Sequence, residues 1–128
     1  MPEKILVVDD EPDTVSLLSL TLGRAGYTVI KATSGRAGLD IAARERPDLI
    51  ILDIMMPDLS GLEVLKALRH LYAVPPVIFF TAKSRVEDMV EGMEAGAYRY
   101  LVKPTSREKL LETVKAALTD LNNHPRQA

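Results

Sequence analysis

Short apolar runs alternate along the chain with longer stretches in which apolar residues recur every three or four positions. The runs are continuous rather than alternating, which is the pattern of strands buried on both faces of a parallel sheet. They predict strands at residues 5–8, 28–30, 49–52, 77–80 and 100–102. Because a helical stretch follows each run, the sequence predicts five βα units in an α/β doubly wound fold.

Glycine, proline and serine residues mark the ends of the predicted helices. The first helix stops at Gly26, which suits a left-handed cap, and the second lies between Ser34 and Pro47. Ser60 and Ser84 each stand three residues before a glutamate, a capping-box pattern that predicts the starts of the third and fourth helices. The apolar stripes are Val15, Leu18, Leu22 and Ala25 in the first helix; Leu62, Leu65 and Leu68 in the third; Val86, Met89, Val90 and Met93 in the fourth; and Leu110, Val114, Ala117 and Leu121 in a fifth that begins at Thr105 or Ser106.

The order of the strands determines where a site can form. Of the two common doubly wound orders, the flavodoxin-like order 2-1-3-4-5 fits five strands, and its ligands bind outside the carboxyl ends near the first and third strands. The first strand ends in Asp9-Asp10-Glu11, the third in Asp53, the fourth in Thr81 and the fifth in Lys103-Pro104. Carboxylates, one hydroxyl and one ammonium group therefore converge on one rim of the predicted sheet.

This combination of groups points to phosphoryl chemistry. Carboxylates packed together raise one another's pKa unless a cation joins them, and oxygen ligands without His or Cys suit Mg²⁺. A carboxylate beside Mg²⁺ can attack an activated phosphoryl donor, and Lys103 and Thr81 can bind the phosphoryl oxygens. Taken singly, an Asp at a strand end caps a helix, a Thr ends a strand and a Lys is solvated. Their joint placement favours the site.

Composition narrows the function classes. The 128 residues suffice for one domain, which we place at residues 1–121 with a polar tail at 122–128. The absence of cysteine excludes disulfides, thiolate metal sites and cysteine nucleophiles. A net charge of −2 argues against direct binding to nucleic acid or an anionic membrane. No export signal or membrane-spanning apolar run is present in the sequence, so we expect a cytoplasmic protein.

At these residues the sequence resembles the receiver domains of two-component response regulators, over residues 4–120. The resemblance covers nearly the whole chain, and its motifs occur in order and on the expected elements. The matching segments are Ile-Leu-Val-Val-Asp9-Asp10-Glu11, Asp53-Ile-Met-Met-Pro57-Asp-Leu-Ser-Gly61, Thr81-Ala82, Ala95-Gly96-Ala97 and Tyr100-Leu-Val-Lys103-Pro104.

The resemblance implies a Mg²⁺-dependent switch. Asp53 would accept a phosphoryl group from a sensor histidine kinase or a phosphotransfer protein, and the domain would catalyse its own phosphorylation and dephosphorylation while acting mainly as a regulator. Mg²⁺ would be held by Asp10 directly, by Asp9 through water, by Asp53 and by the Met55 backbone carbonyl. The residues that the resemblance assigns to phosphoryl binding are Thr81 and Lys103.

The resemblance also implies how the signal leaves the domain. Tyr100 would turn inward as Thr81 moves, changing the face made by the fourth helix, fifth strand and fifth helix. Met55 and Lys83 stand at positions that tune the lifetime of the phosphoryl group. The Lys103–Pro104 bond would be cis. The output partner, either a separate protein or a covalent domain, is not identified, and a phosphorylation-dependent homodimer is a further implied partner.

The sequence departs from the family pattern in two places. Ser60 replaces a frequent acid and should cap the third helix equally well. Tyr98-Arg99 replaces an acidic pair common in receivers that dimerise through that face, which argues against the usual charge-paired dimer.

Other readings of the fold explain the residues less well. A flavin binder needs a Ser-, Thr- or Gly-rich first loop rather than an acidic one, and a dinucleotide enzyme needs G-x-G-x-x-G after the first strand. A haloacid-dehalogenase-type phosphatase needs a D-x-D pattern there. The remaining alternative is a receiver-like interaction module that is not phosphorylated; such a module would normally have lost one of Asp10, Asp53, Thr81 or Lys103.

Overall fold

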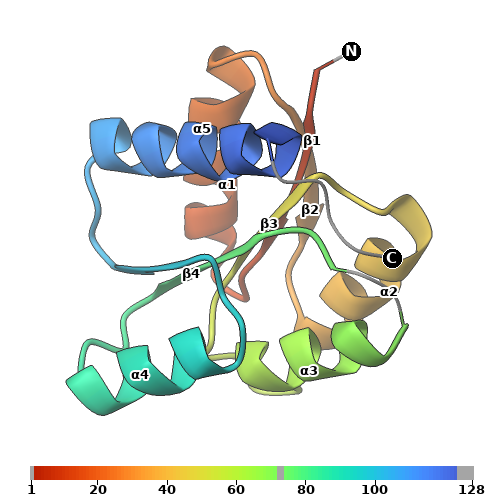
Figure 1. The fold of residues 1–128 in the computed structure, drawn as a ribbon, viewed down its shortest axis with the longest axis vertical. Helices are drawn as coiled ribbons and strands as arrows, with labels where there is room; N and C mark the ends of the chain where they lie inside the picture. The colour runs from red at the N-terminus through yellow and green to blue at the C-terminus, as the bar shows by residue number, and fades with distance from the viewer. Residues whose placement is uncertain (1, 72–73, 124–128) are drawn as a thin grey trace.

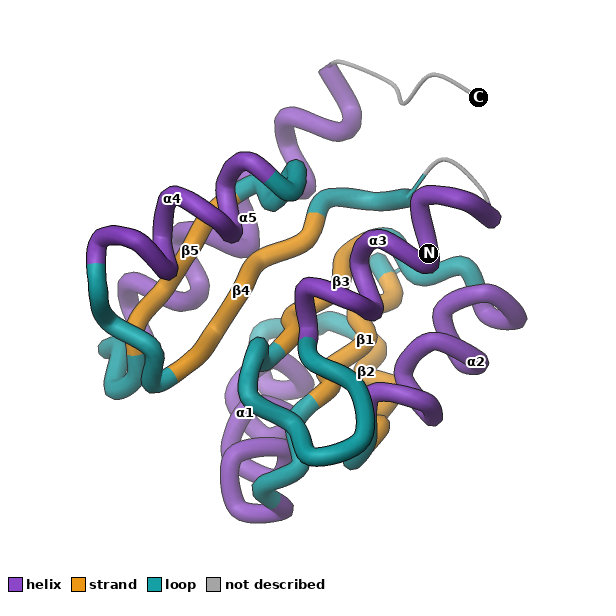
Figure 2. The backbone as a smooth tube through the Cα atoms, turned by 90° about the horizontal axis from the view of Figure 1, so that it is seen from below, coloured by secondary structure: helices purple, strands orange, loops and turns teal. Residues whose placement is uncertain are grey.

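Five parallel strands form the centre of the molecule, in the predicted order β2-β1-β3-β4-β5 (Figures 1 and 2). The computed structural model describes the backbone of residues 2–71 and 74–123 and the side chains up to residue 120. The predicted apolar position of Leu121 and the whole predicted tail at 122–128 therefore lie outside the described side chains. The strands are β1 (Lys4–Val8), β2 (Thr28–Ala32), β3 (Leu49–Leu52), β4 (Val77–Thr81) and β5 (Arg99–Val102).

The helices cover both faces of the sheet, which confirms the doubly wound fold. On one face lie α1 (Pro12–Arg24) and α5 (Arg107–Asn123); on the other lie α2 (Gly35–Glu45), α3 (Gly61–Leu71) and α4 (Val86–Glu94) (Figure 1). Alternate residues of each central strand contribute to the two hydrophobic clusters. This two-sided burial explains why the strand sequences are continuously apolar.

Most of the predicted helix ends are confirmed. Gly26 follows the end of α1 with φ +101°, and the Ser34 hydroxyl accepts a hydrogen bond from the Ala37 amide at the start of α2. Ser60 and Glu63 form the reciprocal capping box of α3, with hydrogen bonds of 3.0 and 3.2 Å. The start of α5 matches the second of the two predicted positions: the hydroxyl of residue 106 accepts from the amide three residues later.

The apolar stripes of α1 and α3 differ slightly from prediction. Ala25 is the exposed C-cap of α1 rather than part of its buried stripe, because the helix ends one residue earlier. In α3, Leu62 is only half-buried and Val64 is buried instead. The change in α3 reflects how the helix is rotated against the sheet, which a periodic pattern predicts only to within one position.

The predicted start of α4 was wrong, and the apolar stripe of this helix is largely exposed. Its N-cap is Arg85, not Ser84, and no side chain caps it, because the helix begins one residue too late for the serine to reach the first amides. Three residues of its apolar stripe face outward, since Val86, Val90 and Met93 are 67%, 50% and 43% exposed, whereas Met89 is half-buried. Only Gly92 of this helix is fully buried.

Helix α4 contacts the rest of the domain through a buried glycine and through polar contacts at its two ends. A Cβ added to Gly92 would lie 2.8 Å from the Tyr100 ring, so the absence of a side chain allows the helix to approach β5. At the C-terminal end, the Arg69 guanidinium of α3 donates to the Ala95 carbonyl (2.6 Å). At the N-terminal end, Asp88 forms an ion pair with Lys83 (3.7 Å).

Within the described ranges, 2–71 and 74–123, we find no helix that is both long and apolar enough to span a membrane.

Candidate functional site

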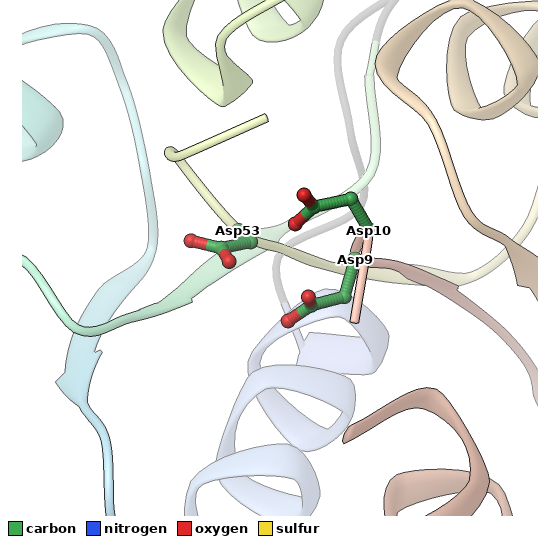
Figure 3. Close-up of side chains that lie close together, drawn as sticks. All are labelled: Asp9, Asp10 and Asp53. Atoms are coloured by element: carbon green, nitrogen blue, oxygen red, sulfur yellow. The ribbon is translucent and has the colours of Figure 1, made fainter. Parts of the chain in front are cut away.

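The register of the sheet brings the first group of predicted residues together. Strands β1 and β3 pair with Val8 opposite Leu52, so Asp9 and Asp53 leave the sheet side by side. The Asp53 amide donates to the Val8 carbonyl (3.0 Å) and fixes this arrangement. Asp10 completes the group: one carboxylate oxygen from each of the three acids lies within 4.8 Å of the others (Figure 3).

The Lys103 ammonium group lies among these carboxylates. It donates to Asp9 Oδ2 at 2.8 Å, to Glu11 Oε1 at 3.0 Å and to Asp53 Oδ2 at 3.2 Å. Lys103 follows β5 at a cis bond to Pro104, as the resemblance implied. Although β5 is the edge strand farthest from β1, the long lysine side chain reaches the acids from that side of the site.

Burial and charge act in opposite directions at this ion cluster. Burial raises the pKa of Asp9 above its ordinary value, and the Asp53 charge adds to the rise, whereas the hydrogen bonds from Lys103 and the Glu11 amide lower it. Burial alone would lower the pKa of Lys103, but the hydrogen bonds to Asp9 and Glu11 and the charge of Asp53 raise it overall. Lys103 therefore stays protonated and compensates the buried carboxylates.

Asp10 differs from its two neighbours. It is half-buried, and among the residues that the structure describes its carboxylate has no hydrogen bond or ion pair. A half-buried carboxylate next to Asp9 and Asp53 favours a cation. The donor set consists of oxygens alone, which fits Mg²⁺ better than Zn²⁺ or a copper ion.

Thr81 ends β4 and is completely buried. Its hydroxyl accepts a long hydrogen bond from the Lys83 amide (3.4 Å). The Tyr100 hydroxyl donates to the Lys83 carbonyl (2.8 Å), so the two predicted switch residues are joined through one residue of the β4–α4 loop.

The Tyr100 ring points inward, onto Phe79, with the two ring centroids 6.1 Å apart. Burial, followed by the charges of Asp88, Asp53 and Glu91, raises the pKa of Tyr100 to about 12. The hydroxyl therefore remains a hydrogen-bond donor at neutral pH.

Met55, two residues after Asp53, lies at the edge of the site. The Met55 amide donates to Asp53 Oδ1 (3.0 Å), and its side chain is exposed. Lys83, the other residue predicted to tune the lifetime of the phosphoryl group, forms an ion pair with Asp88 of α4.

Three contacts were not predicted. Glu11 binds Lys103, Arg69 binds the end of α4, and Asp58 accepts hydrogen bonds from the Gly35 and Arg36 amides. Glu11 is one of the three acids that follow the first strand in the sequence, but its contact with Lys103 has no local signal. The other two residues carry no local signal, because their partners are more than twenty positions away.

The arrangement of acids, lysine and threonine agrees with a comparison against known families. A model described as the response regulator receiver domain matches residues 5–115. The chain belongs to this family. As a receiver domain it is a part of response regulators, the class of protein that the sequence motifs indicated.

Similar proteins support the assignment. This receiver is 48% identical over 118 residues to the alkaline phosphatase synthesis transcriptional regulatory protein PhoP of Bacillus subtilis, covering 92% of this chain and 49% of the relative. It is 41% identical over 117 residues to the probable transcriptional regulatory protein TcrX of Mycobacterium tuberculosis, covering 91% and 50%. The receiver thus spans about half the length of these relatives.

Among solved structures, the receiver resembles a CheY-like response regulator receiver domain protein from Methanospirillum hungatei. The TM-score is 0.91 at 30% sequence identity, and the match covers 96% of this chain and 98% of the other.

Proposed function

We propose that this receiver domain is a phosphorylation-dependent signalling switch that takes a phosphoryl group onto Asp53. The observation that carries the proposal is the cluster of Asp9, Asp10 and Asp53 carboxylates with the Lys103 ammonium bound among them. The donor would be the phosphohistidine of a sensor kinase or a phosphotransfer protein. The signal would pass to an output partner, either separate or covalently attached.

The transfer would follow from the chemistry of these side chains. An Asp53 carboxylate oxygen attacks phosphorus, a new O–P bond forms, and the P–N bond of the donor breaks with its electron pair leaving on the imidazole nitrogen. Lys103 neutralises charge on the phosphoryl oxygens, for which it must exchange part of its present contact with Asp9. The Thr81 hydroxyl donates a further hydrogen bond to the phosphoryl group.

Asp9, Asp10, Asp53 and the Met55 backbone carbonyl are the groups that would hold Mg²⁺. The support is the oxygen-only donor set and the uncompensated Asp10 carboxylate. When bound, Mg²⁺ would supply positive charge that draws the phosphoryl oxygens toward Asp53.

The test is phosphorylation by a small donor. Incubation with acetyl phosphate or phosphoramidate and Mg²⁺ should add one phosphoryl group, labile to base and hydroxylamine, as seen by intact mass. Asp53→Asn should remain unlabelled, and removal of Mg²⁺ by EDTA should abolish labelling of the wild type. Full labelling of Asp53→Asn would refute the acceptor assignment. An unlabelled wild type would favour the non-phosphorylated interaction module.

For the output we propose the face made by α4, β5 and α5. The support is the connection from Thr81 through Lys83 to Tyr100, and the packing of the Tyr100 ring under Gly92. Movement of Thr81 toward a phosphoryl group would alter the loop that holds Tyr100 and so change the position of α4. The exposed apolar side chains of α4 belong to this face.

The output proposal is tested by association. Tyr98 and Arg99 lie at this face: the Tyr98 hydroxyl donates to Asp120, and the Arg99 guanidinium lies 4.5 Å from the Tyr98 ring centroid. Sedimentation or partner binding should compare phosphorylated wild type with Tyr100→Ala and Arg99→Asp. If phosphorylation changes association equally in all three proteins, another face carries the output.

A further inference from the structure

The loop between β3 and α3 is attached to the neighbouring helix α2 by one side chain. The Asp58 carboxylate accepts hydrogen bonds from the Gly35 amide (3.0 Å) and the Arg36 amide (2.8 Å). These are the first two amides of α2, and the Ser34 hydroxyl caps the third residue of the same turn. The start of α2 is therefore satisfied partly by its own cap and partly by a residue from another loop.

The attachment is close as well as directional. A Cβ added to Gly35 would lie 2.7 Å from the Leu59 carbonyl oxygen and 2.8 Å from Leu59 Cβ, so the loop backbone rests directly on the helix end. The hydrogen bonds from Arg36 and Gly35 lower the pKa of Asp58, which keeps the residue in the carboxylate form that accepts them.

The same loop carries the proposed site at its other end. Asp53 begins it, the Met55 amide donates to Asp53 Oδ1, and the Gly61 amide closes it by donating to the Ile54 carbonyl (2.9 Å). Among the described residues, the two Asp58 contacts are the only hydrogen bonds that join residues 56–59 to another element. Without them, the outer part of the loop is held by apolar packing alone.

Helix α2 is in turn packed against the strand that carries the other two acids. A Cβ on Gly38 would lie 2.7 Å from a Val8 methyl carbon, and Val8 immediately precedes Asp9 and Asp10. Asp58 thus connects the loop with Asp53 and Met55 to the helix that packs under the end of β1.

We propose that Asp58 is a positioning residue for the cation site. By tying the β3–α3 loop to α2, it sets the distance between the oxygens supplied by the loop and the carboxylates supplied by β1. The inference rests on the proposed Mg²⁺ site. It adds a residue that does not touch the ion but fixes two groups of its ligands relative to each other.

The experiment compares Asp58→Ala with Ser34→Ala. Both changes remove a cap from the first turn of α2, but only the first releases the loop. Mg²⁺ titrations monitored by amide chemical shifts, without any phosphoryl donor, give the affinity; urea denaturation of the same proteins gives the stability. We expect Asp58→Ala to bind Mg²⁺ about tenfold more weakly, the low end for groups that orient metal ligands, and Ser34→Ala to stay within about twofold of wild type.

A conservative variant separates positioning from general damage. In Asp58→Asn one oxygen can still accept from an α2 amide, so its Mg²⁺ affinity should lie between those of wild type and Asp58→Ala. Equal Mg²⁺ affinity in wild type and Asp58→Ala overturns the inference while leaving the proposed function intact, and so does an equal loss in Ser34→Ala. A wild type that binds no Mg²⁺ overturns both.

Discussion

Replacing Lys103 by methionine should destabilise the domain far more than replacing an ordinary lysine. Methionine keeps the apolar stem and removes the ammonium group that binds Asp9, Glu11 and Asp53. The matched control is Lys66→Met, because Lys66 is exposed and has no ion pair among the described residues.

The size of the effect follows from burial. The Asp9 and Asp53 side chains are 2% and 5% exposed, and Lys103 is 16% exposed. Removing one partner of a buried ion pair lowers the free energy of unfolding by about 3–5 kcal/mol. Because Lys103 is still partly exposed, we expect Lys103→Met to lose about 3 kcal/mol, at the low end of this range. The exposed Glu11 contact adds little. For Lys66→Met we expect a change within about 0.5 kcal/mol.

The loss should depend on pH. In the folded wild type the pKa of Asp9 is raised above 3.8, and loss of the Lys103 hydrogen bond raises it further. A carboxyl group with a raised pKa in the folded state does not lower the free energy of unfolding when it is protonated, below its unfolded pKa near 3.9. The destabilisation is complete above its folded pKa, where the group is ionised in both states. The difference between wild type and Lys103→Met should therefore be smallest near pH 4 and grow toward neutral pH.

Urea denaturation at several pH values, with and without Mg²⁺, measures these changes. Mg²⁺ at 100 times its dissociation constant stabilises the folded state by about 2.7 kcal/mol, so saturation should recover much of the loss in Lys103→Met. Wild type should gain less from the same Mg²⁺ concentration, because its ammonium group competes for the carboxylates. If Lys103→Met loses no more stability than Lys66→Met at pH 7, or loses as much at pH 4 as at pH 7, the charge compensation described for this cluster is wrong.

Three further outcomes are expected. Asp10→Ala should weaken Mg²⁺ binding much more than Glu11→Ala, since Glu11 is occupied by Lys103; equal losses in a titration would contradict the ligand assignment. Met55→Asn should change the rate of autodephosphorylation, because Asn can hydrogen-bond an attacking water and Met cannot; decay followed by intact mass checks it, and an unchanged rate counts against a role in lifetime. Tyr100→Phe, which loses the hydrogen bond to the Lys83 carbonyl, should lower the free energy of unfolding by about 1 kcal/mol, and no change in a denaturation curve would show that this bond is unimportant.

The sheet and the rim of the site were predictable because the signals are local. A continuous apolar run defines where a buried strand ends, and in a parallel sheet the next residue stands at the rim. For this reason the sequence alone predicts that Asp9, Asp53 and Thr81 lie together. The position of Lys103 followed in the same way, although its three carboxylate partners did not.

The misplaced and missing features are those that depend on packing. Periodicity identified the apolar stripe of α4 but not that Val86 and Val90 would face outward, because only Gly92 allows the helix to meet β5 closely. Asp58 and Arg69 escaped prediction for a different reason. Each binds backbone groups of a segment that only the complete fold brings near. Every residue type other than proline has the same backbone amide and carbonyl groups, so such a hydrogen bond does not require a particular residue type at the partner position.

Because α4 buries so little of its surface, the free energy of local unfolding should differ between parts of the molecule. Opening this helix alone would expose one buried glycine and part of an aromatic ring, whereas opening α1 or α3 would expose several fully buried aliphatic side chains. Local unfolding of α4 should therefore require less free energy than global unfolding, and its amide hydrogens should exchange with solvent well before those of β1, β3 and β4. A partner that covers the exposed side chains of α4 would then slow this exchange, so that binding could be measured as protection of the α4 amide hydrogens.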